Sequence, residues 1–482
     1  MDVVGSLRRL GRTLFTVDLR SLALVRILLG TLILVDLASR ARLLTTNYTD
    51  LGAHPRIAVL SYREPGSLPS LHLLSGSADV QAALFGLAAL VALALVLGWH
   101  TRIATTLSWL LAISLQGRHE LLLDGGDHAL RHLLFWCMFL PLGAWGSLDA
   151  RRRGRPPPTA FVCSPASAAL LLQGASLFLV TGLVKTGPEW TTDWTAVRYA
   201  ISREGWIRPF GEWLVSHPFL PELLTPIVRW WEIAGPLLLF VPVAVWLMRA
   251  IGIAGIWGML LGLGLGLKLN LFPFIAGSGL IAFLPGALWD RLGLRVSSAP
   301  PATDDAPGRV RAAARLAGRL ALVALLLLLV VWMNARTVNH ALAPPEPLQR
   351  FATRLQMGQG WMMYAPSPRH VDVQFAHRGL LANGAEIDLD RAPATGPAWE
   401  EVRRAWQDYR FLYFLQKLYA PRWHKPLDEY ALWLCRRWNA DARGGGRLVS
   451  VNVASVSQEI VLGDAPAPPP ETLTRTTALC PR

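Results

Sequence analysis

Long apolar runs recur over most of this chain and decide what it can fold into. Runs of about 17 to 25 apolar residues are long enough to cross a bilayer as helices. We count eight or nine such runs within residues 21–333. Hydrophobic residues make up 52% of the 482 residues and charged residues only 17%, which is too apolar for a soluble globule. The sequence therefore predicts an α-helical polytopic membrane protein.

The arginines predict how these runs are oriented. Cytoplasmic loops of membrane proteins are enriched in Lys and Arg. Arginines precede the first run and follow the fourth and the eighth: Arg8, Arg9, Arg12 and Arg20; Arg151, Arg152, Arg153 and Arg155; Arg291, Arg295, Arg309, Arg311 and Arg315. This pattern predicts a multi-pass plasma-membrane protein with a cytoplasmic N-terminus. Residues 297–307 have the composition of a flexible linker.

The character of the chain changes near residue 334, after which charged residues appear regularly. We predict a transmembrane helical domain at residues 1–334 and an extracytoplasmic domain, periplasmic or extracellular, at residues 335–482. Cys435 and Cys480 both lie in the second domain. An oxidising compartment would permit a disulfide between them.

Short periodic patterns predict that the second domain is mixed α+β. Apolar and polar residues alternate at 371–375 and 447–453, which is typical of half-buried strands. Residues 399–418 and 427–438 have a helical pattern.

Lys185 stands where a long apolar run ends. The predicted helix starts near residue 168, and the Gly187-Pro188 pair stops it one turn beyond the lysine. Apolar surroundings favour the neutral amine, so such a lysine can act as a base near neutral pH. The alternative is a lysine that reaches from the helix end to water.

Asp127 and His128 open the fourth run on the outer side, where the fifth run delivers Lys185. Runs joined by a short inner loop are expected to be antiparallel neighbours, so these residues are predicted to lie near Lys185. Asp127 can also act simply as a helix N-cap. His128 and His132 are four residues apart, but no third ligand is evident and we expect no metal.

Glu232 lies inside an apolar run, where a carboxylate is costly unless it is paired or protonated. Its candidate partners are Arg229, Arg131 and Lys185, and catalysis and a structural ion pair both remain open. Lys268 at another outer helix end is the main rival to Lys185 as a base.

Small residues repeat in the seventh run every four positions, a spacing that lets helix backbones approach closely. They are Ala254, Gly258, Gly262 and Gly266. The repeat predicts internal helix packing.

Several common functional motifs are absent from the sequence. We find no nucleophile elbow, phosphate loop or dinucleotide fingerprint, and no nucleic-acid-binding motif, so the net charge of +14 is attributed to membrane orientation. A transporter stays open, because Glu232, Lys268 and the Gly- and Pro-interrupted eighth run could line a pathway.

Four segments together resemble the bacterial horizontally transferred transmembrane domain (HTTM) family, which is similar to the membrane part of the vitamin K-dependent gamma-carboxylase. They are residues 18–26, 47–56, 125–128 and 182–190, and the resemblance covers about residues 16–289. Residues 359–366 look like the start of the family's extracytoplasmic domain.

The resemblance implies roles for the residues around Lys185. Lys185 would be the base that deprotonates a reduced vitamin K or menaquinone-type hydroquinone, and Glu189 and Trp190 match the rest of its motif. His128, preceded by Asp127, would assist the transition state. The implied reaction couples hydroquinone epoxidation, with oxygen and carbon dioxide as co-substrates, to carboxylation of glutamate or a related acceptor.

The expected protein is therefore an enzyme of the bacterial inner membrane whose partners are membrane lipid, quinone and a secreted peptide or protein. The alternative is a non-catalytic membrane protein that assists maturation of a secreted partner or presents its outer domain to it.

Overall fold

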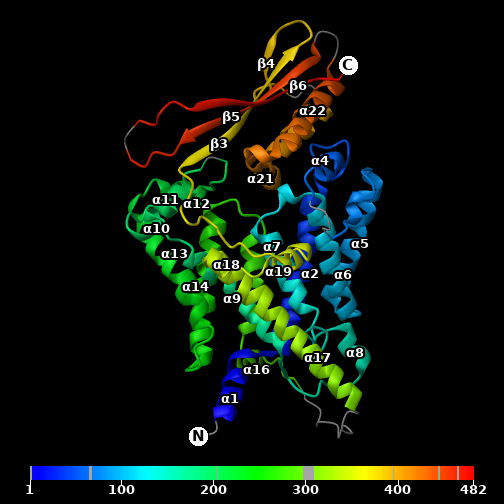
Figure 1. The fold of residues 1–482 in the computed structure, drawn as a ribbon, viewed down its shortest axis with the longest axis vertical. Coiled ribbons are helices and arrows are strands. Elements are labelled where there is room, and N and C mark those ends of the chain that lie inside the picture. Colours follow the sequence, from blue (N-terminus) through cyan, green and yellow to red (C-terminus); the bar gives the residue numbers. More distant parts are fainter. Residues whose placement is uncertain are drawn as a thin grey trace.

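A computed structural model describes residues 3–63, 68–203, 205–296, 309–393, 396–442, 446–463 and 466–481. The linker predicted at residues 297–307 lies outside these ranges. The chain is mostly helical, and a small sheet forms one end of the molecule (Figure 1). The N-terminus lies at the opposite end.

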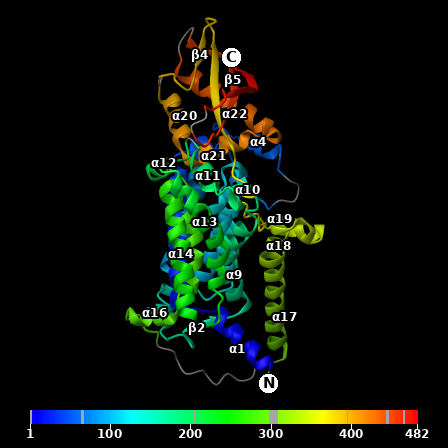
Figure 2. The same ribbon diagram turned by 90° about the vertical axis from the view of Figure 1, so that its left-hand side faces the viewer.

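Among the described residues, five helices are long and apolar enough to cross a membrane. They are α2 (Leu19–Ala41), α5 (Ala78–Leu97), α9 (Pro165–Leu183), α14 (Val245–Gly266) and the continuous helical stretch Ala313–Val338. That stretch joins α17 (Arg309–Leu325), the π-helical η4 (Leu326–Trp332) and α18 (Met333–Val338), and it stands beside the other helices in Figure 2. These helices support membrane association, although five is fewer than the eight or nine spans predicted.

The other predicted spans fall on helices that are too short or too polar. α7 (Gly125–Cys137) has 13 residues, which rise about 20 Å, whereas the hydrocarbon core is about 30 Å thick. The eighth run is divided between α15 (Phe272–Ser278) and the 3-10 helix η3 (Gly279–Phe283). α6 (Thr101–Arg118) is rich in polar residues, and α13 (Phe219–Leu238) carries three charged ones.

The long helices pack as neighbouring pairs. α2 packs against α5, α9 against α13, and α13 against α14. Gly182 permits the close approach of α9 and α13, because a Cβ at this position would lie 2.9 Å from the Cβ of Glu232.

Short elements close both ends of the helical bundle. The end with the N-terminus holds α1 (Val3–Phe15), α8 (Leu148–Arg153), α16 (Gly286–Arg291) and the antiparallel pair β1 (Thr16–Asp18) and β2 (Phe161–Cys163). The opposite end is next to the C-terminal sheet, and we call it the outer end for that reason. It holds α3 (Leu44–Tyr48), α4 (Arg56–Leu60), α10 (Pro188–Thr191), α11 (Ala196–Ile201), α12 (Pro209–Val215) and the 3-10 turns η1 (Leu71–Leu73) and η2 (Glu120–Leu122).

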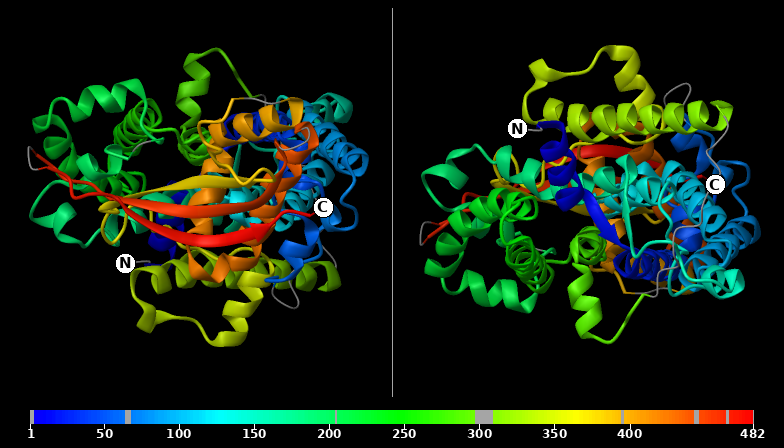
Figure 3. Two further views of the ribbon diagram at one scale, coloured as in Figure 1. Left: turned by 90° about the horizontal axis from the view of Figure 1, so that it is seen from above. Right: turned by 90° about the horizontal axis from the view of Figure 1, so that it is seen from below.

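The C-terminal region contains an antiparallel four-stranded sheet in the order β4-β3-β5-β6. Its strands are β3 (Val371–Leu381), β4 (Glu386–Asp388), β5 (Leu448–Glu459) and β6 (Glu471–Leu479). The two predicted strands fall in β3 and β5, with Phe375 opposite Ser455, whereas β6 was not predicted. Seen from above, the sheet crosses the end of the bundle (Figure 3).

Helices pack beneath this sheet. They are α20 (Pro397–Gln407), α21 (Tyr409–Leu418) and α22 (His424–Asp441), with the 3-10 turn η6 (Pro421–Trp423) between the last two. The helix predicted at residues 399–418 is divided because Asp408 caps α21. A disulfide joins Cys435 of α22 to Cys480, just after β6.

The predicted boundary between residues 334 and 335 falls inside α18. The chain then forms the 3-10 turn η5 (His340–Leu342) and α19 (Glu346–Arg354) before residues 356–370, which we call the strap. The strap lies against the bundle: Thr181 Oγ1 donates a hydrogen bond to the carbonyl of Trp361 (3.2 Å), and the backbone N–H of Gly187 donates one to that of Pro366 (3.0 Å). The outer region is therefore tied to the helices through the strap.

Candidate functional site

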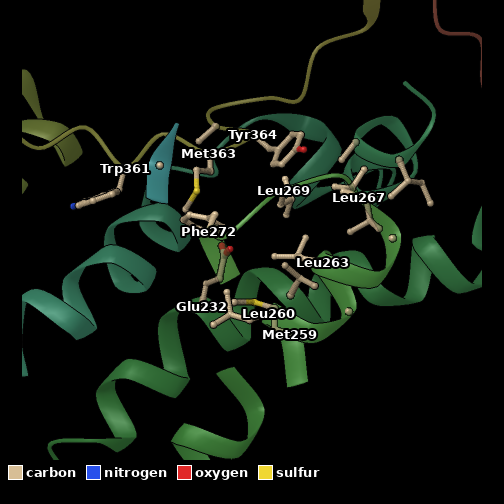
Figure 4. A pocket seen from close by; sticks show the side chains of 18 of the residues that line it. Glu232, Met259, Leu260, Leu263, Leu267, Leu269, Phe272, Trp361, Met363 and Tyr364 are labelled. Carbon is tan, nitrogen blue, oxygen red and sulfur yellow. The ribbon is translucent and has the colours of Figure 1, made fainter. Parts of the chain in front are cut away.

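A cavity of about 1000 Å³ lies at the outer end of the bundle. The C-terminal part of α9, the middle of α13, one face of α14, the strap and α21 surround it. Most of its lining is apolar or aromatic, including Phe178, Trp206, Trp231 and Phe272. Figure 4 shows Glu232 near one end of this cavity and Tyr364 at the other.

Lys185 and Glu232 form a buried ion pair in the cavity wall. Lys185 Nζ donates to Glu232 Oε2 at 2.5 Å, and the side chains are 3% and 6% exposed. Both residues line the cavity. The alternative in which Lys185 reaches from the helix end to water is therefore wrong. Lys185 is the partner of Glu232 among the three that the sequence left open.

The local sequence explains why Lys185 ends up in this wall. Ser164 and Ser167 form a capping box that starts α9, and the helix ends at Leu183, so Lys185 follows as a non-helical residue. Trp190 of α10 covers the amine, whose Nζ lies 4.2 Å from the ring centroid. Burial lowers the pKa of Lys185 below its ordinary value, and the Glu232 carboxylate opposes that shift.

Glu232's other predicted partners take different roles. Arg229 Nε donates to the backbone carbonyl of Lys185 at 3.1 Å, which fixes the chain just beyond α9. Arg131 Nη1 donates to Gln116 Oε1 (2.6 Å) and to Gln356 Oε1 of the strap (3.0 Å).

His128 lines the same cavity as Lys185. Its Nδ1 lies 2.7 Å from Arg131 Nη2. Because a guanidinium only donates, Nδ1 must accept this hydrogen bond, so the neutral imidazole carries its proton on Nε2. The prediction that His128 lies near Lys185 agrees with this geometry, since both residues line one cavity.

Asp127 does not face the cavity. Asp124 is the N-cap of α7, and Asp127 occupies the third helical position of its capping box. The prediction that Asp127 is the N-cap is therefore wrong. The cap lies three residues earlier, at Asp124, whose side chain accepts from the backbone N–H of Gly126 and of Asp127. Asp124 lines the cavity.

Asp127 instead joins a buried network of four charged residues, which we call the ionic bridge. Its carboxylate accepts from Arg40 and from Arg410 Nη1 (2.7 Å), and Asp36 accepts from Arg40 Nε (2.7 Å) and Arg410 Nη2 (2.5 Å). Arg410 belongs to α21. The ionic bridge therefore fastens the outer region to α2 and α7.

Glu189 and Trp190 hold the strap in place. Glu189 Oε1 lies 2.7 Å from Nε2 of His370, and Trp190 Nε1 donates to the carbonyl of Tyr364 at 2.8 Å. Trp190 also lines the cavity. Lys268, the predicted rival base, does not line it, although Leu267 and Leu269 on either side do.

The glycine repeat of α14 does not pack against another helix along its whole length. Gly258, Gly262 and Gly266 line the cavity, and a Cβ on Gly258 or Gly262 would meet no atom within 4 Å. The prediction of internal packing is wrong for these two positions, because their missing side chains leave room in the cavity.

The sequence interpretation missed the polar residues at the outer end of the cavity. They are Arg203, Tyr364, Arg369, Tyr409, Tyr413 and Lys417. They come from three segments far apart in the chain, so no local spacing could have grouped them.

No cluster of three His, Cys, Asp or Glu side chains that could hold a metal ion occurs in the part of the chain that the structure describes. Both ring nitrogens of His132 lie near backbone carbonyls, those of His128 (2.6 Å) and Met357 (3.3 Å). In comparisons with protein-family models, curated proteins and solved structures, nothing matches this chain.

Proposed function

We propose that the protein is a carboxylase-like membrane enzyme that binds a reduced quinone of the vitamin K or menaquinone type in the cavity. Lys185 is its base. The observation that carries the proposal is a buried lysine, paired with one carboxylate, in the wall of a large apolar cavity. The HTTM-like sequence around Lys185 supports the same assignment.

The lining fits a flat, apolar ring bearing hydroxyl groups. Trp190, Trp206 and Trp231 line the cavity and offer aromatic surface to such a ring. When bound, the hydroquinone would supply the oxygen-dependent chemistry that yields a strong base for carboxylation.

The residues of the wall would handle the first proton. Because burial lowers the pKa of Lys185, the amine and the Glu232 carboxylate can share a single proton, which leaves Nζ able to accept another from a hydroxyl group. Trp190 keeps water from the amine on one side. His128, held by Arg131, presents Nε2–H as a hydrogen-bond donor on the same cavity.

The proposal includes an orientation. The arginine-rich end with α1 and α8 faces the cytoplasm, and the sheet, the strap and the cavity face the periplasm or the exterior of a bacterial plasma membrane. The elements α6, α7, α13 and α15 would be embedded between the five long helices. An acidic group on a secreted peptide or protein is the proposed acceptor.

The test uses the purified full chain in detergent with reduced menaquinone-type hydroquinone, oxygen and carbon dioxide. Epoxide and quinone are measured by mass spectrometry. Lys185→Ala should lower turnover by about 100-fold or more, while Lys268→Ala, at another outer helix end but off the cavity, should match the wild type. Equal turnover in Lys185→Ala would remove that residue from the reaction.

A second candidate is a non-catalytic membrane protein, favoured by one observation. Lys185 is fully paired with Glu232 at 2.5 Å, which a purely structural ion pair would also show. In that case Lys185→Ala and His128→Ala would leave cellular function intact, and removal of the outer region would abolish it.

A further inference from the structure

The outer end of the cavity gathers positive charge that the proton-transfer site does not use. Arg203 follows α11, Arg369 lies in the strap, and Tyr413 projects from α21, yet all three line one cavity. Tyr364 marks this end in Figure 4, opposite Glu232. The polar groups of the cavity thus form two separate sets.

Arg203 is nearly buried and its donors are incompletely used. Its side chain is 12% exposed, and its buried Nε makes no hydrogen bond among the described residues. The Asp372 carboxylate lies 3.7 Å from that Nε, an ion-pair distance beyond hydrogen-bond reach. A guanidinium in this position has capacity for another acceptor.

Arg369 adds a second positive charge to the same end. Burial lowers the pKa of Arg203, and the positive charge of Arg369 lowers it further, whereas Tyr364 and Asp372 raise it. The charge of Arg369 thus disfavours the charged form of Arg203, which is mostly buried. An anion between them would offset this effect.

An aromatic shelf fixes the geometry of this end. Trp206 packs edge-on against Tyr409 (5.3 Å between ring centroids) and Tyr413 (6.0 Å), and Arg203 lies over Trp206 at 5.7 Å. Lys417 Nζ lies 4.6 Å from the centroid of Tyr413, and it is anchored by donating to the carbonyl of Leu123 at 2.8 Å. The shelf joins α21 to the bundle.

We propose that the outer end of the cavity is a binding subsite for an anionic oxygen group, a carboxylate or a phosphate, held by Arg203 and Arg369. Guanidinium groups match both anions through paired N–H donors. The subsite rests on the proposed function in one respect: it would hold the acidic group of the peptide or protein acceptor while the hydroquinone occupies the Lys185 end.

A direct binding measurement tests the subsite without any turnover. The full chain in detergent is titrated calorimetrically with glutarate and, separately, with inorganic phosphate, in the absence of hydroquinone. We expect saturable binding of at least one anion that weakens as ionic strength rises. The preferred anion tells whether the source is a carboxylate side chain or a phosphate group.

Two variants and one matched control locate the binding. Arg203→Gln and Arg369→Gln should each weaken it by about 10-fold or more. Arg198→Gln, on α11 but outside the cavity and paired with Glu222 at 3.4 Å, should bind as the wild type does. Arg369 is exposed, so its variant remains informative if Arg203→Gln fails to fold.

The outcomes separate this subsite from the reaction at Lys185. Absence of binding for both anions, or unchanged binding in Arg203→Gln and Arg369→Gln, would overturn the subsite and leave the hydroquinone assay untouched. Arginine-dependent binding would support the subsite even if Lys185→Ala retained full hydroquinone turnover, a result that would reject only the proposed base.

Discussion

Two buried sets of charged residues in this protein differ in what surrounds them. In the ionic bridge, Asp36 and Asp127 each accept from both Arg40 and Arg410, and the four charges sum to zero. The pair of Lys185 and Glu232 has one contact between its charges and borders a cavity. Both sets of charged residues are buried to a similar degree, but they differ in the number of partners of each charge and in the space beside them.

The difference indicates which buried charges are available for chemistry. The ionic bridge is closed, because each carboxylate already has two guanidinium partners and the cavity beside Asp36 and Arg40 measures only about 30 Å³. It connects α2, α7 and α21, so it is a fastening between the helices and the outer region. The Lys185 pair is open on the cavity side, so its protonation can respond to a bound molecule.

Breaking the ionic bridge should have the largest effect on stability. Arg410→Met leaves Asp36 and Asp127 with Arg40 alone, so one buried carboxylate is uncompensated, which costs about 3 to 5 kcal/mol. Thermal unfolding in detergent measures the loss, and proteolysis reports release of the outer region. Arg391→Met is the control, since the Arg391 side chain is 90% exposed and lies 3.9 Å from Asp388. A stable Arg410→Met protein with a docked outer region would contradict the fastening role.

Asp124 stands between the two sets and should make stability depend on pH. Burial and the nearby Asp127 charge raise the pKa of Asp124 to about 6, from the ordinary 3.8. Between those pH values the folded protein holds a proton that the unfolded chain has lost, so the free energy of unfolding falls as pH rises. The two-unit difference corresponds to at most about 3 kcal/mol.

Asp124→Asn should remove this dependence while keeping the cap, because an asparagine side chain also accepts at an N-cap. Relative to the wild type, the variant should gain stability as pH rises from about 4 to about 6 and should keep that gain at higher pH. Denaturant unfolding across this range is the measurement, and Asp79→Asn in the first turn of α5 controls for loss of a charge. Parallel curves for wild type and Asp124→Asn would show that the carboxyl is charged throughout.

Breaking the Lys185 pair should cost less than breaking the ionic bridge. Lys185→Met leaves Glu232 beside a cavity, where the carboxyl can take up a proton, so we expect a loss of about 1 to 2 kcal/mol, below the usual cost of an uncompensated buried charge. The double variant Lys185→Met with Glu232→Leu should regain most of that stability without regaining the proposed hydroquinone turnover. If Lys185→Met were as unstable as Arg410→Met, the Lys185 pair would be a structural ion pair of the same kind as the ionic bridge.

Sequence reasoning succeeded where the determining pattern is local. The apolar runs that became α2, α5, α9 and α14 are long and uniform, so length and hydropathy sufficed. The run before Trp289 is not among these long helices, because Pro273 starts a new short helix within it. Counting runs cannot show how far a helix continues through such residues.

Contacts between distant segments were beyond the reach of local patterns. Glu232 lies 47 residues from Lys185, and the sequence could only name the lysine as one of three partners. Arg410 lies 283 residues from Asp127 and arrives on a separate helix. Its role could not have been inferred, because an isolated arginine in a helical pattern has no feature that marks it as buried.

The smallest effect on stability should come from filling the open side of the cavity. Gly255 and Gly258 lie almost one turn apart on α14, but a Cβ on Gly255 would lie 2.0 Å from the Trp231 ring, whereas one on Gly258 would meet nothing within 4 Å. Gly258→Leu should therefore change stability by less than about 0.5 kcal/mol, while Gly255→Leu should destabilise by about 1 to 3 kcal/mol through overpacking. A leucine at Gly258 still occupies space that a quinone-type ligand would need, so binding of that ligand should weaken by about 10-fold, roughly 1.4 kcal/mol. Undiminished ligand binding in Gly258→Leu would mean that the ligand does not lie against the open side of the cavity formed by α14.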